Sequence, residues 1–485
     1  MSLLNNFTLG DHHIGETAKF VKASEHQGLG HRPQFIASLR HYFFCAMFVG
    51  TNLKLGAPHL CGEDHMMEET MPVPPLPIID DEFQSRDLYA PDVIANPYPY
   101  YQALRDQPIQ FGLEDYPPGT VPGVDKPHPA WVVLKHADVV DVCRRPETFS
   151  SRDIMQEESE APTLMLVNHD RPRHTELRAI AQKAFHPKRV MEDVAPWMER
   201  TVNKQLDLIG DAEVDFMRDL APNLPALVMT RLIGLPEADY VLLRRWANAF
   251  MVTSDFTVEE RQACNIELWS YFQEAVDKRY TKIERGAEVP DDLMSAFITA
   301  ESDGNKLTRE EVVRFCLTLV VAGAETTGYL LGNLIDVLVS EDGLYDKVRA
   351  DRALIRNLVE ESLRRDGPVQ RLHRVCVEDT MIGEAHIKAG DWVAIFHASA
   401  NRDPEVWERP DDFILDRPNF RKHVTFGNGI HHCMGAGIAR NEAVQMITSI
   451  MDRYERIEPA GERIRQRGGL LNYGLETCPV RFVSA

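Results

Sequence analysis

One long apolar segment limits the folds that this chain can adopt. Residues 315–338 have a strongly apolar helical pattern, and the segment just before them, Thr308-Arg-Glu-Glu311, has the pattern of a capping box. A helix that is apolar all round has to be buried, so other elements must surround it. The segment therefore predicts a central helix inside a domain large enough to enclose it.

The rest of the sequence predicts further helices and only short strands. Helical periodicity dominates from about residue 172 to residue 365, whereas strand-like patterns are short and lie at residues 131–134, 390–396 and 478–483. The predicted fold class is therefore mainly α with small β-sheets.

Chain length and one proline-rich segment suggest the domain organisation. The 485 residues are enough for one large domain or two. Residues 71–78, MPVPPLPI, are predicted to form an extended connector. We expect an N-terminal extension at residues 1–85, which ends in this connector, and the main domain at residues 86–485.

The composition argues against several classes of protein. Lys and Arg total 53 against 74 Asp and Glu, and the net charge of −21 disfavours a nucleic-acid partner and an anionic membrane surface. The eight cysteines form no Cys-x-x-Cys pair, so neither a zinc finger nor a disulfide framework is indicated, and the cytoplasm is the predicted location. The apolar residues 35–50 contain Arg40 and His41 and are shorter than the roughly 20 residues of a membrane span. We expect a packed or interfacial helix there, and no membrane span.

A glycine-rich segment at residues 425–437, TFGNGIHHCMGAG, presents two histidines and one cysteine. A P-loop would need Lys-Ser/Thr after its last glycine, and a dinucleotide-binding turn would need a glycine where His432 stands. His431, His432 and Cys433 are consecutive, so their side chains diverge and do not converge on one zinc ion. The remaining hypothesis is a single thiolate offered to a large cofactor, and the alternative is an inert cysteine buried in a turn.

An amphipathic helix is predicted to follow Cys433. Apolar residues recur there at spacings of three and four, namely Ile438, Ala439, Ala443, Val444, Ile447, Ile450, Met451 and Tyr454. Cys433 then lies at or just before a helix N-terminus, where free N–H groups and the helix dipole favour a thiolate over a thiol. The neighbouring glycines let the backbone approach a flat cofactor, and this combination is typical of a thiolate axial ligand to haem iron.

The segment Phe426-Gly-Asn-Gly-Ile-His-His-Cys-Met-Gly435 resembles the haem-binding signature of the cytochrome P450 family, F-x-x-G-x-[HR]-x-C-x-G, at every fixed position. The resemblance extends over the predicted main domain and implies the cytochrome P450 fold with haem b as the cofactor. It implies that Cys433 is the axial thiolate on the iron and that Phe426, Gly427 and Gly435 lie next to the haem. His431 is implied to pair with a haem propionate.

A charged pair lies ahead of this signature. Glu361 and Arg364 are three residues apart, so they share one face of a helix and can pair. By itself such a pair is usually a solvated surface salt bridge. In this chain it resembles the E-x-x-R motif of the family, and the resemblance implies that Arg417 joins the pair and that the three residues support the haem-binding core.

The apolar segment carries a second motif, Ala322-Gly-Ala-Glu-Thr-Thr327. A carboxylate buried in the middle of a helix is costly and is usually kept for a purpose. Gly323 could leave room for a ligand beside the backbone. The motif resembles the A-G-x-[ED]-T sequence of the family, which implies that Glu325 relays protons and that Thr326 holds the iron-bound dioxygen species by a hydrogen bond. The alternative is that both threonines bond back to the preceding turn.

Three basic residues are expected to hold the haem propionates. His174 and Arg178 are four apart and share a helical face, which by itself is more often solvated. They resemble the family's D-P-P-x-H-x-x-x-R motif, although Arg171 stands in place of the first proline. Arg374 resembles the remaining propionate-binding arginine.

These motifs together imply a haem-thiolate monooxygenase that inserts one oxygen atom from O2 into a hydrophobic small organic substrate, by hydroxylation or O-dealkylation. Electrons are expected from a ferredoxin and an NAD(P)H-dependent ferredoxin reductase, because the chain has no flavin or iron–sulfur motif. Two alternatives are a peroxide-driven peroxygenase of the same fold, which would normally lack the Glu325–Thr326 pair, and a non-catalytic haem sensor, which would need only the thiolate.

Two surfaces are predicted by the same analogy. The wall of the substrate pocket is expected at residues 163–167, Val320, Ala324, 370–372 and 470–471. A basic patch for an acidic ferredoxin is expected near Cys433, formed by Arg171, Arg173, Lys183, Lys188, Arg189, Arg421, Lys422 and Arg440.

Overall fold

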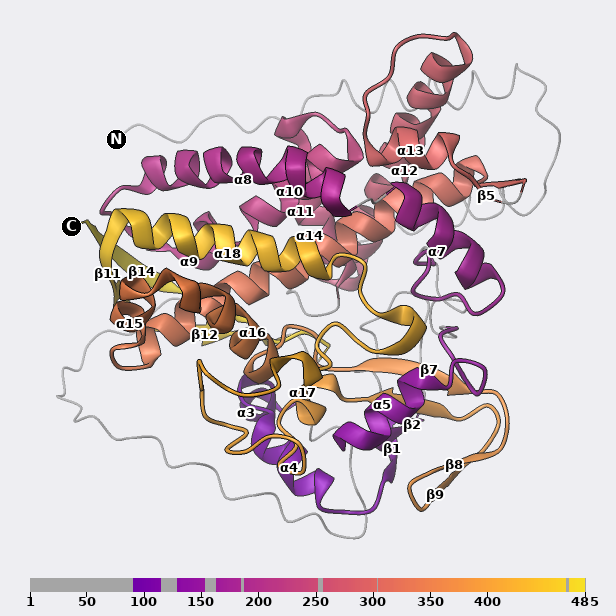
Figure 1. Cartoon of the computed structure of the whole chain (residues 1–485). Coiled ribbons are helices and arrows are strands. Elements are labelled where there is room, and N and C mark those ends of the chain that lie inside the picture. Colours follow the sequence, from indigo (N-terminus) through magenta and orange to yellow (C-terminus); the bar gives the residue numbers. More distant parts are fainter. Residues whose placement is uncertain are drawn as a thin grey trace, which may run out of the picture. The chain divides into compact units, whose positions relative to one another are not determined.

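The predicted central helix is present in the computed structural model as α14 (Arg309–Ser340) (Figure 1). Its capping box forms as expected, because the Glu311 amide donates to Thr308 Oγ1 at 3.2 Å and the Thr308 amide donates to Glu311 Oε2 at 2.9 Å. Helices far apart in the sequence pack against α14, namely α10 (Asn223–Ile233), α11 (Tyr240–Phe250), α12 (Val258–Glu284), α16 (Ile355–Arg365) and α18 (Ala436–Arg453).

The structure describes residues 90–114, 129–152, 163–184, 187–251, 256–302, 304–467 and 471–484. All of them belong to one unit, Pro74–Ala485. The N-terminal extension, the proline-rich connector and the apolar residues 35–50 lie outside the described residues. The expectations for these segments therefore stay predictions, as does the domain boundary at residue 86.

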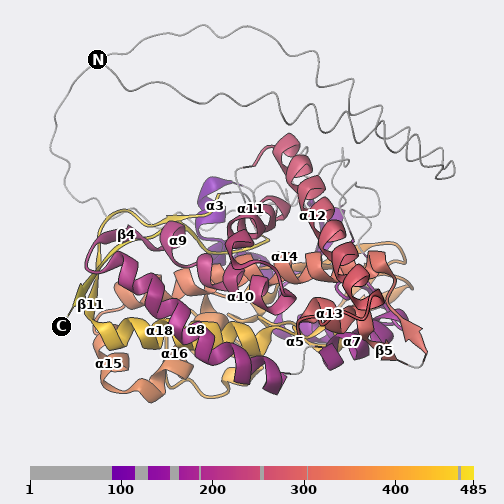
Figure 2. The ribbon, with the colours of Figure 1, turned by 90° about the horizontal axis from the view of Figure 1, so that it is seen from above.

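The other helices enclose α14 and cover the sheets (Figures 1 and 2). They are α3 (Pro91–Ala95), α4 (Tyr98–Arg105), α5 (His136–Arg144), α7 (Arg173–Ala184), α8 (Pro187–Ile209), α9 (Phe216–Asp219), α13 (Leu293–Thr299), α15 (Leu344–Ala350) and α17 (His397–Ala400). Short 3-10 helices are η2 (Glu237–Asp239), η3 (Arg352–Leu354), η4 (Phe420–Lys422) and η5 (Gly429–His431).

The strands form one sheet of five, one of three, and hairpins. The five-stranded sheet has the order β1 (Gln110–Glu114), β2 (Pro129–Val133), β10 (Trp392–Ile395), β7 (Leu372–Cys376) and β3 (Phe149–Ser150), and only the β2–β10 pair is parallel. The three-stranded sheet has the order β11 (Tyr454–Pro459), β14 (Pro479–Ser484) and β4 (Glu213–Asp215). The two-stranded pairs are β12 (Ile464–Arg465) with β13 (Leu475–Thr477), β5 (Glu301–Ser302) with β6 (Asn305–Lys306), and β8 (Thr380–Ile382) with β9 (Ala385–Ile387).

The central strand β10 explains why its sequence is apolar without interruption. Side chains alternate across a strand, so Trp392 and Ala394 pack with α3 and α4 on one face of the sheet. Val393 and Ile395 pack with α5 on the other face. A strand that is buried on both faces has a continuous apolar sequence, whereas a strand with one solvated face alternates. The predicted strands at 131–134, 390–396 and 478–483 correspond to β2, β10 and β14, and the fold class of helices with small sheets is confirmed.

Within the described residues, α14 is the one helix that is long and apolar enough to cross a membrane. In this domain 72% of its most apolar window is buried inside the protein. The helix is therefore the core of the largest hydrophobic cluster.

Candidate active site

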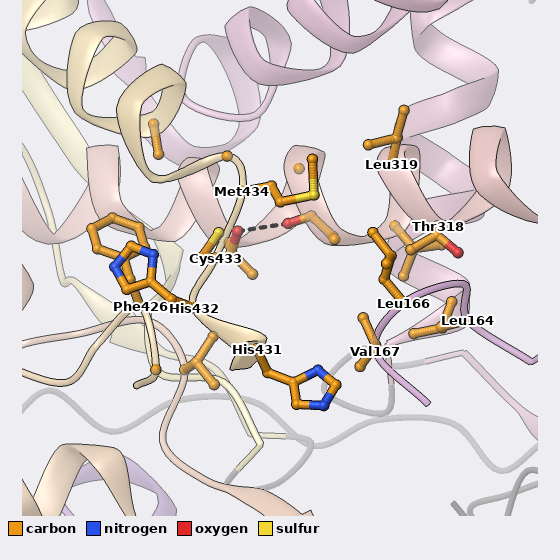
Figure 3. A pocket seen from close by; sticks show the side chains of 18 of the residues that line it. Leu164, Leu166, Val167, Thr318, Leu319, Phe426, His431, His432, Cys433 and Met434 are labelled. Atoms are coloured by element: carbon orange, nitrogen blue, oxygen red, sulfur yellow. Dashed lines mark hydrogen bonds between the residues drawn. The ribbon is translucent and has the colours of Figure 1, made fainter. Parts of the chain in front are cut away.

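A cavity of about 360 Å³ lies between α14, the segment before α7 and the glycine-rich loop that contains Cys433 (Figure 3). Figure 3 shows Cys433 and Met434 on one side of it and Leu164, Leu166 and Val167 on the other. Two cysteines, Cys143 and Cys433, are among the residues that line it.

The glycine-rich loop turns so that Cys433 faces the cavity. Gly427 and Gly429 have φ values of 72° and 69°, a conformation that glycine adopts without steric cost. A Cβ at Gly429 would lie 2.3 Å from the backbone oxygen of Cys143 in α5, so this loop can approach α5 only with glycine. The Cys433 amide donates to the Phe426 oxygen at 2.9 Å, which closes the turn just before α18 begins at Ala436.

The environment of Cys433 acts on its pKa in both directions. The side chain is accessible from the cavity but lies deep in the protein, and this burial raises the pKa of the thiol. The backbone N–H groups of Gly435 and Ala436 lower it, as do Arg178 and Arg440. The expectation that the helix N-terminus favours a thiolate therefore identified real donors, but burial outweighs them. A metal ion bound to Cys433 would supply the missing stabilisation, because a coordinating thiol is deprotonated outright.

A second group of lining residues is basic, and it comes from four elements: His174 and Arg178 of α7, Arg374 of β7, His397 of α17 and His431 of the loop. The rings of His174 and His431 lie 4.3 Å apart between centroids. The Ser151 hydroxyl and His431 Nε2 are hydrogen bonded at 2.9 Å, and Arg178 donates to the backbone oxygen of His432 at 2.8 Å. The structure thus brings together His174, Arg178, Arg374 and His431, which the sequence motifs had selected separately.

Asp170 acts electrostatically on His174 and Arg374, but no ion pair between described residues includes a member of this basic group. His174 Nε2 and His397 Nδ1 are buried and have no hydrogen-bond partner among those residues. Burial lowers the pKa of His174 to about 4, with Arg178 and Arg171 adding to the effect. Burial lowers the pKa of His431 to about 3, with Arg374 adding to it, and burial also lowers the pKa of Arg374. Buried charges and open ring nitrogens of this kind need an anionic partner.

These residues fit a haem. The thiol of Cys433 faces the cavity as a sulfur ligand, and the basic group offers partners for two propionates. Phe426, Gly427 and Gly435 line the cavity beside the thiol, as the resemblance implied. The sequence analysis did not select His397, because a histidine that follows an apolar strand has no motif of its own. Only the fold places it beside Arg374.

The Ala322–Thr327 motif of α14 is divided between two environments. Thr326 lines the cavity, and its hydroxyl donates to the Ala322 oxygen at 2.9 Å, which is the back-bonded alternative. Glu325 is buried but is not among the residues that line the cavity. Its carboxylate accepts from Tyr329 at 3.1 Å and from Asn472 at 3.4 Å. The space beside Gly323 is taken by Met229, whose Sδ would lie 2.7 Å from an added Cβ.

The predicted Glu361–Arg364 pair is fully buried and bidentate. Arg364 donates to both carboxylate oxygens of Glu361 at 2.8 and 2.7 Å. Arg417 donates to the same carboxylate at 2.9 and 3.1 Å. Both guanidiniums also bind backbone oxygens of the segment 401–412, including that of Asp412. The three residues therefore tie α16 to the irregular segment that leads to the cysteine loop.

The predicted pocket wall is correct in one part and wrong in another. Leu164, Met165, Leu166 and Val167 line the cavity. On α14 the lining residues are Thr318, Leu319, Val321, Ala322, Gly323, Thr326, Thr327 and Leu330. Val320 and Ala324 are buried in the core instead, because the cavity-facing side of the helix is set by its packing and each residue turns it by about 100°.

The two C-terminal segments of the predicted wall are also only partly correct. Of residues 370–372 only Leu372 lines the cavity, although the preceding Pro368 and Val369 do so as well. Gln370 is buried and its amide donates to the Gly367 oxygen at 3.0 Å. Leu471 does not line the cavity, and residue 470 lies outside the described part of the chain.

Some lining residues had not been expected from the sequence. Met229, Met251, Phe297 and Phe315 come from four different segments, and no local pattern connects them. Glu442 of α18 also lines the cavity, is 1% exposed, and its Oε2 has no partner among the described residues. Burial raises its pKa well above the ordinary value, which favours the neutral carboxyl. The sequence signal that could have identified Glu442 was its position next to Ala443, on the apolar face of the predicted helix.

Comparison with known proteins agrees with this site. The sequence model of the family described as Cytochrome P450 matches residues 242–469. Cytochrome P450 109 from Bacillus spizizenii is 32% identical over 397 residues, which cover 80% of this chain and 92% of that protein. The crystal structure of CYP109E1 from Bacillus megaterium in complex with corticosterone is 30% identical, with a TM-score of 0.69 over 80% of this chain and 99% of that one.

A third relative has been solved with a carrier-bound ligand. P450BioI in complex with hexadec-9Z-enoic acid ligated acyl carrier protein is 28% identical, with a TM-score of 0.70 over 81% of this chain and 99% of that one. The family carries iron protoporphyrin IX with a cysteine axial ligand, so haem is the cofactor of this protein as well. The motifs, the fold and these relatives agree: the chain belongs to the cytochrome P450 family of haem-thiolate monooxygenases.

Proposed function

We propose that this monooxygenase hydroxylates or O-dealkylates an uncharged, apolar small molecule. The observation that carries the proposal is the chemistry of the cavity wall. Apart from the basic group, His432, Glu442 and the two cysteines, the described lining residues have no ionisable side chain. Those from residues 164–167, α10, α13 and α14 are glycine, aliphatic, aromatic, methionine or threonine. A wall of this kind desolvates an apolar ligand at little cost and disfavours a charged one.

The residues of the chain have distinct roles in this proposal. Haem, when bound, supplies the activation of dioxygen. Cys433 would hold its iron, and His174, Arg178, Arg374 and His431 would hold its propionates. Thr326 lines the cavity and would offer its hydroxyl to the oxygen, and Glu325 would supply protons from the same helix.

The relatives support an apolar substrate without choosing one. The structure of CYP109E1 holds corticosterone, and that of P450BioI holds a fatty acid on its carrier protein. A steroid and an alkyl chain share a mostly hydrocarbon skeleton. We test the class by titrating the purified haem protein with steroids, fatty acid methyl esters, monoterpenes and a matched amine, and following the Soret shift that accompanies loss of iron-bound water. The proposal expects shifts for the neutral apolar compounds, and preferential binding of the charged amine would contradict it.

Thr326 is expected to govern how reducing equivalents are used. Replacement by alanine removes the hydroxyl at the cavity but leaves the apolar wall, so haem content and substrate binding should stay nearly unchanged. Product per NAD(P)H oxidised should fall severalfold, with the difference recovered as peroxide or water. Unchanged coupling would exclude the proposed role.

Glu325→Gln should lower kcat by on the order of 10²-fold, because it removes an acid from proton transfer.

We propose that electrons come from a ferredoxin that docks near Cys433, at a smaller basic patch than the sequence suggested. Arg171 pairs with Glu147, Arg173 with Glu176 and Glu311, and Arg440 with Glu360. Lys183 donates to the Glu301 oxygen at 3.2 Å, and the side chains of residues 188 and 189 lie outside the described ones. Arg421 and Lys422 of η4 are exposed, as is Arg144, which donates to the Asn428 side-chain oxygen at 3.2 Å.

The docking proposal predicts a charge-dependent reduction rate. Arg421→Glu/Lys422→Glu should slow reduction by an acidic ferredoxin about tenfold at low salt, and the difference should vanish at high salt. The matched control is Lys282→Glu/Arg285→Glu at the C-terminal end of α12. This double variant changes the net charge by the same amount, but no residue of α12 lines the cavity. Equal slowing in both double variants would assign the effect to overall charge and remove the docking site.

A further inference from the structure

We propose that Tyr329 is a positioning residue that holds the Glu325 carboxylate outside the substrate cavity between proton transfers. The inference rests on the proposed function, because it assumes that Glu325 acts as the proton donor. It goes beyond that function in assigning the resting place of the acid and the residue that maintains it.

The geometry separates Glu325 from the place where it has to act. Thr326 lines the cavity, whereas the preceding residue, Glu325, is buried and does not line it. Tyr329 follows Glu325 by one helical turn, and its hydroxyl donates to Glu325 Oε1 at 3.1 Å. The Asn472 amide donates to Oε2 at 3.4 Å. Tyr329 does not line the cavity either.

The ring of Tyr329 is held in place by the C-terminal segment. A Cβ at Gly474 would lie 2.1 Å from Tyr329 Cδ1, so the ring packs directly against the backbone of Gly474. The segment is itself fixed, because the Tyr473 amide donates to the Pro368 oxygen at 2.6 Å and Gln466 donates to the Asn472 oxygen at 2.9 Å. The tyrosine hydroxyl is therefore held at a defined point beside Glu325.

The two hydrogen bonds give the Glu325 carboxylate a fixed resting place. Both donors can bind the carboxylate that is left after a proton has passed to the cavity. To deliver the next proton the carboxyl group has to gain a proton and turn away from Tyr329 toward Thr326. Tyr329 thus returns the carboxylate to the same place beside Asn472 after each proton transfer.

The test compares Tyr329→Phe with Tyr345→Phe. Tyr345 lies in α15, does not line the cavity, and its buried hydroxyl donates to the Tyr454 oxygen at 2.9 Å, so the control removes a comparable hydrogen bond elsewhere. We expect Tyr329→Phe to lower kcat and product per NAD(P)H severalfold while KM and the substrate-induced Soret shift stay unchanged. A crystal structure of the variant should show the Glu325 side chain displaced from Asn472. Tyr345→Phe should change none of these.

A double-variant cycle separates this inference from the proposed function. Adding Tyr329→Phe to Glu325→Gln should cause little further loss, because the group that Tyr329 positions is already inactive. If Glu325→Gln itself leaves turnover unchanged, the proton-donor role is wrong. If Glu325→Gln slows turnover but Tyr329→Phe leaves kcat, coupling and the Glu325 position unchanged, the donor role stands and the positioning role is wrong. Equal losses in Tyr329→Phe and Tyr345→Phe would assign the effect to packing and also overturn it.

Discussion

Cys433→Ser is expected to abolish the red-shifted Soret band of the reduced carbon monoxide complex, because a serine hydroxyl cannot supply the thiolate that produces it. Monooxygenase turnover should be lost with it. The effect should be complete, because Cys433 is one of only two cysteines among the described residues that line the cavity.

The second lining cysteine supplies the matched control. Cys143 belongs to α5, is buried, and burial raises the pKa of its thiol, as it does for Cys433. The backbone N–H groups of Gly435 and Ala436 act on Cys433 alone. Cys143→Ser should therefore keep the red-shifted band. A band that survives Cys433→Ser but disappears in Cys143→Ser would place the iron ligand on α5.

Glu361→Ala should cause the largest loss of stability among single substitutions in the described part of the chain. The carboxylate is fully buried and is the shared partner of Arg364 and Arg417, so its removal leaves two guanidiniums buried without their anion. Breaking a buried ion pair from one side typically costs about 3–5 kcal/mol. We expect a loss of that order in the free energy of unfolding, measured by denaturant titration, together with poor retention of haem.

The adjacent residue, Glu360, supplies a matched control for this prediction. Glu360 lies on the same helix and pairs with Arg440 and His423, but its side chain is 23% exposed and that of Arg440 33%. Water can replace part of this interaction, so Glu360→Ala should cost only about 1 kcal/mol. Equal losses for the two alanine variants would mean that the buried network does not carry the stability assigned to it.

Local patterns in the sequence were enough to find most elements of the site. The capping box at Thr308 and the apolar residues after it define α14, because capping and helix periodicity depend on residues within a few turns. The spacing of Glu361 and Arg364 predicted a shared helical face for the same reason. The resemblance around Cys433 was sufficient to identify the family, because the loop is a local structure. Its turn is closed by a hydrogen bond within the loop, and its glycines permit its close approach to α5.

The tertiary structure decided what each side chain faces. Val320 and Thr326 have similar local surroundings in the sequence, but the packing of α14 buries the first in the core and turns the second to the cavity. The sequence placed Arg173 in a basic patch, and its ion pair with Glu311 joins residues 138 positions apart. Burial is the sum of contacts from distant segments, and it outweighs the helix N-terminus at Cys433. Sequence alone therefore predicted the central helix, several of the strands, the fold class and the family, whereas the partner of each charged side chain and its orientation toward the cavity depended on the folded chain.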